Sequence, residues 1–307
     1  MHILIIGAAG MIRRKVAAAL AGHQLTLADV VAPQAPGAAC LTVDLSDPAT
    51  PAWLLAAKPD AIIHLAAIVS GEAEADFDKG YATNLDATRA LLDAIRRMPD
   101  YCPRVVFAST CAVFGPPFPT RVPDDFHTTP LTSYGTQKAI TELLLNDYTR
   151  RGFLDAISLR LPTICIRPGT PNRAASGFFS NILREPLAGK PAILPVRDSL
   201  RHYFASPRAA TAFFLHALTL DTARIGPNRA LNMPGLSATV AEEIEALRHV
   251  AGQKAVDLIR LEPDATIARI VESWAQDFDA ARATALGFTA ETSFDQIIQA
   301  HLEDGKL

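Results

Sequence analysis

The residues best suited to chemistry are Tyr134 and Lys138, which lie four positions apart in the segment 133–138. If this segment is helical, both side chains lie on one face of the helix. A cation beside a phenol stabilises the phenolate and lowers the pKa of the phenol, which is about 10 in a free tyrosine. The pair could therefore take a proton from an alcohol, with Tyr134 as the base. This spacing is common by chance, so its weight depends on the elements around it.

A second candidate site lies at the N-terminus, where the apolar run 2–6 leads into Gly7 and Gly10. Glycine at a strand-to-helix turn lets the backbone approach a pyrophosphate, which then rests on the helix N-terminus formed by Met11 and Ile12. Asp29 follows an apolar strand about 20 residues later, where an acid binds the adenosine ribose. Because a carboxylate there repels a 2'-phosphate, the sequence favours NAD over NADP. The alternative is a glycine turn in an ordinary βα unit with a solvent-facing Asp29.

The third glycine of this pattern should lie at position 13, where the chain has Arg13. Glycine at this position allows the helix to pack closely on the strand. We expect either a shifted helix or an arginine that extends outward, with weaker binding of the cofactor. The alternative is that Arg13 or Arg14 contacts a phosphate.

The composition excludes several classes of function. The chain has 307 residues, 49% of them hydrophobic, and a net charge of -3, so nucleic acid is not an expected partner. Its apolar stretches are too short to span a membrane, and the N-terminus lacks the features of a signal peptide, which predicts a cytoplasmic protein. The four cysteines are scattered, so neither a metal site nor a disulfide framework is expected.

The first half alternates short apolar runs with helical stretches, as βαβ units do. This pattern predicts an α/β fold, a doubly wound parallel Rossmann sheet with a smaller, mostly helical C-terminal substrate lobe. We assign residues 1–165 to an NAD-binding domain and residues 166–307 to a substrate-binding lobe, with some chain returning to the sheet. Strands are expected at 2–6, 24–28, 39–43, 61–65, 104–108 and 156–161. Helices are expected at 10–21, 50–57, 83–97, 133–151, 176–188, 207–220, 239–251, 263–273, 279–285 and 293–302.

From residue 2 to about 235 the chain resembles the extended short-chain dehydrogenase/reductase family, also called the NAD-dependent epimerase/dehydratase family. The matching segments are Gly7 to Gly10, Asp44-Leu45, His64 to Ala67, Asn84 to Thr88, Ser109-Thr110, Tyr134 to Lys138, Arg160 to Thr163 and Arg167 to Gly169. The resemblance implies further cofactor contacts from Asp44, Leu45, Leu65, Ala66, Ala67, Asn84, Tyr134, Lys138 and Pro162. Each residue taken by itself has an alternative role: Asn84 could be a helix cap, His64 a core histidine and Ser109 a turn residue.

Within this family, the resemblance points away from the nucleotide-sugar dehydratases, because Thr110 is followed by Cys111 and Ala112 instead of an acidic pair. The segment 160–187 resembles the branch that oxidises small sugar acids. The implied reaction is the NAD-dependent oxidation of the 2-hydroxyl of a D-erythronate-like acid to the 2-oxo acid. The implied catalytic residues are Ser109, Tyr134 and Lys138, with Ser109 and Thr110 bonding the reacting oxygen.

A substrate carboxylate needs a cationic clamp, and arginine offers a bidentate fork. Arg173 is the first candidate, followed by Arg167, Arg184 and Arg201, although any of them could be a solvated surface arginine. Other candidate substrate contacts are Ser70, Ser109, Thr110, Tyr134, Asn172, Ser176, Phe178, His202 and Tyr203.

Two other functions stay open. One is a nucleotide-sugar 4-epimerase with retained NAD, and the other is a catalytically weak NAD(P)-binding regulatory protein, which Arg13 makes worth considering. The helices at 83–97 and 133–151 carry apolar faces that resemble the dimer-forming bundle of the family, so a homodimer is expected. The residues of these faces are Leu91, Leu92, Ile95, Ile140, Leu143 and Leu144. Alternatively, the faces only cover their own sheet.

Overall fold

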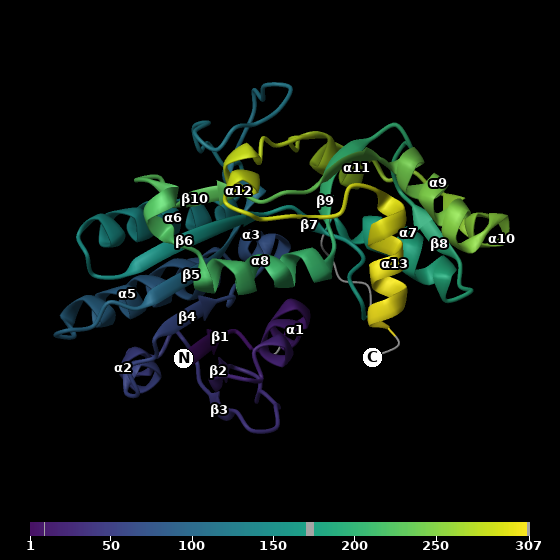
Figure 1. The fold of residues 1–307 in the computed structure, drawn as a ribbon. Helices are drawn as coiled ribbons and strands as arrows, with labels where there is room; N and C mark the ends of the chain where they lie inside the picture. The colour runs from purple at the N-terminus through teal and green to yellow at the C-terminus, as the bar shows by residue number, and fades with distance from the viewer. Residues whose placement is uncertain (9, 170–174, 306–307) are drawn as a thin grey trace. The chain divides into compact units, whose positions relative to one another are not determined.

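The computed structural model describes residues 1–8, 10–169 and 175–305 (Figure 1). The chain forms two compact units, each built from three separate segments. Unit 1 comprises 1–114, 127–160 and 211–231, and unit 2 comprises 115–126, 161–210 and 232–307. The prediction placed one boundary at residue 165, whereas the observed segments of the two units alternate along the chain. That unit 1 binds the cofactor and unit 2 the substrate stays a prediction.

Unit 1 is built on a seven-stranded sheet in the order β10-β6-β5-β4-β1-β2-β3. Its strands are β1 (His2–Ile6), β2 (Gln24–Asp29), β3 (Ala39–Thr42), β4 (Ala61–His64), β5 (Arg104–Thr110), β6 (Asp155–Leu161) and β10 (Ala230–Asn232). Strand β1 runs parallel to β2 and β4, β2 to β3, and β4 to β5. The order from β3 to β6 is that of a doubly wound sheet, so the predicted fold class is confirmed.

Helices cover the sheet of unit 1. They are α1 (Met11–Ala19), α2 (Thr50–Leu55), α3 (Ser70–Ala75), α4 (Phe77–Tyr81), α5 (Ala87–Arg97), α6 (Ser133–Arg150) and most of α8 (Pro207–Thr219). Along β1, Leu4 and Ile6 pack in one cluster with residues of α2, α5 and α6. Ile3 and Ile5 are fully buried as well, and successive residues of a strand point to opposite faces. Both faces of the sheet are therefore covered, and its strands are apolar without alternation.

The predicted strands of unit 1 lie within two residues of the observed ones, but one predicted helix begins late. Residues Ala82–Asp86 form a π-helical turn, η1, and α5 starts at Ala87. The short helices α3 and α4 precede this turn and were not predicted. They place a compact helical segment directly after β4, at the carboxyl end of the sheet.

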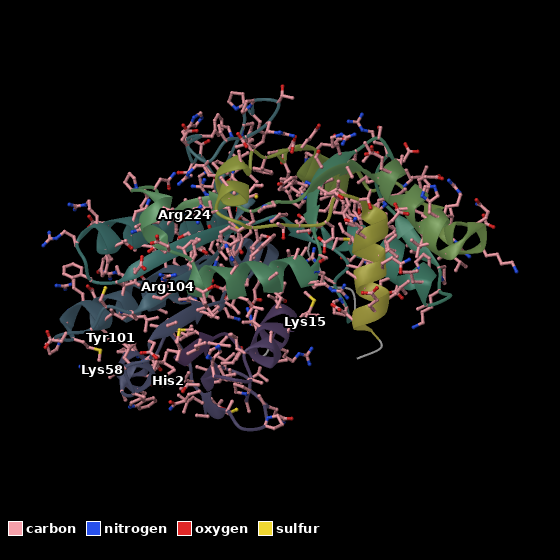
Figure 2. All side chains as sticks on the ribbon, in the orientation of Figure 1. His2, Lys15, Lys58, Tyr101, Arg104 and Arg224 are labelled. Atoms are coloured by element: carbon pink, nitrogen blue, oxygen red, sulfur yellow. The ribbon has the colours of Figure 1, made fainter. Side chains whose placement is uncertain are left out.

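Arg104 ties the returning segment 211–231 to the sheet (Figure 2). Its guanidinium donates hydrogen bonds to the carbonyl oxygens of Ala217, at 2.8 Å, and Leu220, at 3.0 Å. The same group forms an ion pair with Asp155 of β6. One arginine therefore satisfies the carbonyl groups at the C-terminus of α8.

Unit 2 contains two small sheets that the sequence pattern did not predict, although most of its regular structure is helical. Strand β9 (Arg201–Ala205) pairs with β7 (Thr163–Ile164) and β11 (Leu236–Thr239), and β8 (Ala192–Leu194) pairs with β12 (Ile259–Leu261). The helices are α7 (Gly177–Leu187), α9 (Val240–Ala251), α10 (Gln253–Val256), α11 (Ala265–Glu272), α12 (Ala281–Ala285) and α13 (Phe294–Asp304). Phe179, Phe204 and Ile297 are fully buried in the core that joins α7, β9 and α13.

The apolar faces proposed for a dimer are used in different ways. Leu91, Leu92 and Ile95 of α5 are buried against the sheet of unit 1, so the alternative that they cover their own sheet is correct for them. Leu143 of α6 is 64% exposed. The homodimer stays a prediction. Within the described residues, none of the helices combines the length and apolar character needed to cross a membrane.

Candidate active site

The glycine turn lies where the strand order of unit 1 reverses, between β1 and β4. Ligands of doubly wound sheets bind at this point, outside the carboxyl ends of the strands. Gly7 follows β1 with φ +83°, and a Cβ on it would lie 2.5 Å from the amide nitrogen of Ala66, which follows β4. A side chain at Gly7 would thus clash with backbone as well as strain its own. The chain needs glycine here to bring the two strand ends together.

Helix α1 begins directly after this turn, with Gly10 as its N-cap and no side chain that caps it. Met11 and Ile12 form its half-buried first turn. The free N–H groups of such a turn suit an anion. Asp29 ends β2, its side chain is only 8% exposed, and its carboxylate accepts a hydrogen bond from the Val31 nitrogen. Glycine turn, helix N-terminus and acid therefore lie together as the sequence pattern predicted.

Arg13 does not take the outward conformation, which is one of the two arrangements expected for it; that α1 is shifted stays a prediction. The side chain of Arg13 folds back over Gly10: a Cβ on Gly10 would lie 2.8 Å from Arg13 Cδ. The guanidinium donates a hydrogen bond of 2.8 Å to the carbonyl oxygen of Leu65 and lies 3.6 Å from Asp29. Attraction to these two groups fixes it over the turn, where burial lowers the pKa of Arg13. Arg14 is exposed.

The other proposed cofactor contacts follow strands β3 and β4. Asp44 is exposed, and hydrogen bonds from Ser46 lower the pKa of its carboxyl; Leu45 beside it is half-buried. Leu65 is buried, and Ala66 and Ala67 are half-buried after β4. These placements are compatible with a dinucleotide along the edge of the sheet, and their roles stay predictions.

Asn84 is a positioning residue in this structure. It lies in the π-helical turn η1, and its amide group bonds to both the nitrogen and the carbonyl oxygen of Ile68, at 2.8 and 2.9 Å. It also donates to Gln137 of α6. Asn84 is therefore not a helix cap. It holds the loop after β4 against α6, and irregular helical turns of this kind recur at functional sites.

His64, at the end of β4, is a buried core histidine. Its Nε2 lies 3.1 Å from the hydroxyl oxygen of Thr88, and its ring packs edge-on against Phe107. Burial, together with the charges of Lys138 and Arg13, lowers the pKa of His64 to about 3. The ring is therefore neutral at physiological pH.

Tyr134 and Lys138 lie on one face of α6, as the spacing predicted. Thr132 caps the helix by accepting from the Gly135 nitrogen. A Cβ on Gly135 would lie 2.3 Å from the carbonyl oxygen of Ala112, so glycine lets the helix approach the turn after β5. Lys138 Nζ lies 5.7 Å from the centroid of the Tyr134 ring and donates to the carbonyl oxygen of Ala108 at 2.8 Å. Helix and strand end together fix the pair.

The electrostatics of this pair differ from the expectation. Burial raises the pKa of Tyr134 to about 12, and the charge of Arg13 offsets part of that effect. Burial and Arg13 lower the pKa of Lys138 to about 7, so only part of the Lys138 population is charged at neutral pH. The prediction that Lys138 lowers the pKa of the phenol is therefore wrong for the chain alone. Desolvation of the phenol raises the pKa by more than the incompletely protonated Lys138 can lower it.

Ser109 and Thr110 point to opposite faces of the sheet, because they are neighbours at the end of β5. Ser109 is 3% exposed and donates its hydroxyl proton to Glu142 of α6 at 2.5 Å. The hydroxyl oxygen of Thr110 accepts from the Ala112 nitrogen, and the side chain is half-buried. One strand end therefore cannot present both hydroxyls to the same ligand.

The carboxylate that holds Ser109 was missed by the sequence reasoning. Glu142 is 3% exposed and binds the guanidinium of Arg160 with bonds of 3.0 and 2.8 Å. Arg160, on β6, lies over the ring of Phe114. Glu142 follows Lys138 by four positions, so an acid on the face already occupied by Tyr134 and Lys138 was the available signal.

The proposed substrate residues are spread over both units. Ser70, half-buried, starts helix α3 of unit 1. Pro162, proposed to contact the cofactor, is buried between β6 and β7. Asn172 and Arg173, the first candidate for the carboxylate, lie outside the described residues.

Three candidate arginines of unit 2 can be compared. Arg184 is paired with Glu185, and Arg201 with Glu242. Arg167 is half-buried and donates to the hydroxyl and the carbonyl oxygen of Ser176, at 2.7 and 3.2 Å. Within the described residues it has no carboxylate partner, and its buried Nε has no hydrogen-bond acceptor. A partly buried guanidinium that faces no described carboxylate is incompletely compensated, so Arg167 is the candidate best suited to an anionic ligand.

The described residues fit a nicotinamide dinucleotide in all but one respect. The turn at Gly7, the uncapped N-terminus of α1 and the buried Asp29 match the backbone and the acid that such a cofactor needs. The departure is Arg13, whose side chain covers Gly10.

Comparison with known proteins supports this assignment. Residues 3–224 match the model of the NAD dependent epimerase/dehydratase family. The chain is 47% identical to the D-erythronate dehydrogenase of Cupriavidus necator over all of this chain and 99% of the relative, and 42% identical to that of Haemophilus influenzae over 99% of each. The fold matches the crystal structure of the nucleoside-diphosphate-sugar epimerase from Agrobacterium tumefaciens with a TM-score of 0.96 and 60% identity, over 99% of this chain and 94% of that one.

Proposed function

The chain belongs to the NAD-dependent epimerase/dehydratase family, and from this premise we propose that it oxidises the 2-hydroxyl of a small, D-erythronate-like sugar acid. It is a nicotinamide-dependent oxidoreductase, as predicted. The proposed reaction converts R-CH(OH)-COO⁻ and NAD⁺ into R-CO-COO⁻, NADH and a proton. The observation that carries the proposal is the fixed pair of Tyr134 and Lys138 at the carboxyl end of the sheet.

Tyr134 is the proposed base. Within the described residues its hydroxyl has no hydrogen-bond partner, so it is available to an alcohol. Tyr134 would remove the hydroxyl proton while the nicotinamide, when bound, accepts the hydride. Because burial raises the pKa of Tyr134 to about 12, the base needs additional positive charge close to its oxygen. Lys138 in its protonated form supplies that charge from the same helix face.

Thr110 is the hydroxyl that we place next to the reacting oxygen. The local geometry at the end of β5 favours it over Ser109, whose proton is engaged by the buried Glu142. Thr110 ends β5 on the face opposite to Ser109. Among the described residues, none accepts its hydroxyl proton. Ser109 then acts as a positioning residue that ties β5 to α6.

Arg167 is the proposed partner of the substrate carboxylate. Its guanidinium is oriented by Ser176 and faces no acid among the described residues. A carboxylate would satisfy its remaining donors with charge-assisted hydrogen bonds. This supports an acid over a neutral alcohol as substrate. Arg173 stays a second candidate.

NAD is the proposed cofactor, because Asp29 lies at the end of β2 where the adenosine ribose binds. Its carboxylate can accept both ribose hydroxyls. A 2'-phosphate at the same place would face a negative charge.

The proposal is tested by following NADH formation with a panel of acids. D-erythronate, L-threonate, glucuronate and galacturonate are supplied with NAD or NADP, and UDP-sugars serve as a separate group. We expect turnover of a four-carbon acid with NAD. In the Arg167→Met variant the KM for that acid should rise by about tenfold or more, which is the loss of affinity expected when one charge-assisted hydrogen bond is removed. No oxidation of any acid would contradict the proposal.

A nucleotide-sugar 4-epimerase is the second candidate, favoured by the 60% identity to the nucleoside-diphosphate-sugar epimerase of Agrobacterium tumefaciens. Such an enzyme would keep NAD bound through purification and interconvert a UDP-sugar without net NADH. Finding this in the same panel would replace the dehydrogenase. Binding of a dinucleotide with no turnover in either group would favour the regulatory alternative.

A further inference from the structure

Arg13 lies over the glycine turn of the candidate dinucleotide site. Its side chain covers Gly10, its guanidinium donates to the carbonyl oxygen of Leu65, and Asp29 lies 3.6 Å away. Only 24% of the side chain is exposed. A pyrophosphate that approaches the Gly10 backbone must displace the aliphatic part of Arg13. The guanidinium stays attached to the first turn of α1, and in this structure it already lies 3.6 Å from Asp29, the acid proposed to bind the adenosine ribose.

The position of the guanidinium changes what Asp29 can do. An unpaired carboxylate at the ribose repels a 2'-phosphate and thus excludes NADP. Here the guanidinium of Arg13, on the neighbouring helix α1, lies 3.6 Å from the Asp29 carboxylate. A guanidinium also binds phosphate through a planar, bidentate fork. The same side chain can therefore compensate the acid and donate to the phosphate.

We propose that Arg13 sets the coenzyme specificity of this chain: it offsets the charge of Asp29 and donates to a 2'-phosphate, so that the groove accepts NADP as well as NAD. This inference rests on the proposed function for the identity of the cofactor, but not on the substrate. Arg14 on the same helix is exposed, and among the described residues its side chain forms no hydrogen bond or ion pair with Gly10 or Asp29, so we do not assign it this role.

The test measures binding of NADH and NADPH by their fluorescence, without any substrate. The variants are Arg13→Gly, Arg13→Ala and, as a control of equal charge on the same helix, Arg14→Ala. We expect Arg13→Gly to tighten NADH, because the groove is cleared, and to weaken NADPH. The ratio of the two Kd values should shift by about tenfold or more in favour of NADH. This is the change in affinity expected when one charge-assisted hydrogen bond to NADPH is lost. Arg14→Ala should leave the ratio unchanged.

A double-mutant cycle with Asp29→Asn separates specificity from simple obstruction. In the Arg13→Gly background, Asp29→Asn should restore NADPH binding strongly, whereas in the natural chain it should change the ratio little. Equal tightening of both dinucleotides in Arg13→Gly would show that Arg13 only obstructs the groove, and would overturn the inference. Failure of the natural chain to bind either dinucleotide would overturn the cofactor assignment too. Binding with no oxidation of any acid would contradict only the proposed function.

Discussion

The ammonium group of Lys138 donates a hydrogen bond of 2.8 Å to the carbonyl oxygen of Ala108 and so joins α6 to the end of β5. The same group lies 4.4 Å from the centroid of the Phe107 ring, and the side chain is only 2% exposed. A cation held by one carbonyl and an aromatic face is incompletely solvated, and its pKa falls to about 7. The structure therefore holds this charge where Tyr134 can use it, at a cost in stability.

Replacement of Tyr134 by Phe should remove the base and leave the groove intact. We expect Tyr134→Phe to lower kcat on the order of 10²–10⁴-fold, the usual contribution of general base catalysis. The Kd for NADH should change little, because Gly7, Gly10 and Asp29 are untouched. Stopped-flow turnover and fluorescence titration measure the two effects. Equal loss of both would show that Tyr134 acts in binding.

Loss of the Thr110 hydroxyl should lower activity, whereas loss of the Ser109 hydroxyl should lower the stability of the fold. Thr110→Val should lower kcat with little effect on stability, because the side chain is half-buried and its hydroxyl is not bonded to a side chain. Ser109→Ala should destabilise the fold by about 1–3 kcal/mol, since the buried Oε1 of Glu142 loses one of its two hydrogen-bond donors. Denaturant unfolding and steady-state kinetics of both variants check this. A kcat loss confined to Ser109→Ala would restore Ser109 as the catalytic hydroxyl.

Lys138 should make the stability of the chain depend on pH above neutrality. Its pKa is about 7 in the folded chain and 10.5 when unperturbed, so between these values the unfolded state binds more protons. The free energy of unfolding should therefore rise as the pH rises from 7 toward 10. In Lys138→Met this rise should be smaller. Chemical denaturation at several pH values measures it, with Lys79→Met, on an exposed residue, as the control.

The buried pair of Glu142 and Arg160 should matter far more than a surface pair on the same helix. Glu142→Ala removes the buried carboxylate that binds the Arg160 guanidinium, and breaking a buried ion pair from one side typically costs about 3–5 kcal/mol. Asp147→Ala removes the exposed partner of Arg150 and should cost about 1 kcal/mol or less. The difference between the two free energies of unfolding tests the contrast. Similar values would mean that Arg160 finds another partner or water.

Gly7 and Gly152 provide a matched pair for the glycine turn. Both have positive φ, +83° and +74°, but a Cβ on Gly152 meets nothing within 4 Å, whereas on Gly7 it meets the Ala66 backbone. Gly152→Ala should cost about 1–2 kcal/mol from backbone strain alone. Gly7→Ala should cost more and should also weaken NADH binding. Thermal unfolding and titration of the two variants give the comparison, and equal costs would show that the turn can relax.

The sequence by itself determined the features that depend on a residue pattern within one strand or one helix. The apolar runs of β1, β4 and β5 and the four-residue spacing of Tyr134 and Lys138 depend on neighbours along one strand or one helix turn. These features were predicted correctly because the period of the pattern fixes the face on which each side chain lies. The positive φ at Gly7 is a second local feature that the glycine turn indicated, whereas its close approach to the Ala66 backbone is a tertiary contact.

Only the tertiary structure decided which distant groups meet. The direction of Arg13 depends on Asp29 and on the Leu65 carbonyl, which reach it from β2 and the end of β4. The engagement of Ser109 depends on Glu142, 33 residues later in the chain. The short strands of unit 2 carry too few residues to show a period, and the return of 211–231 to unit 1 requires pairing across the sheet. Such contacts arise from packing and charge between elements, which no local pattern encodes.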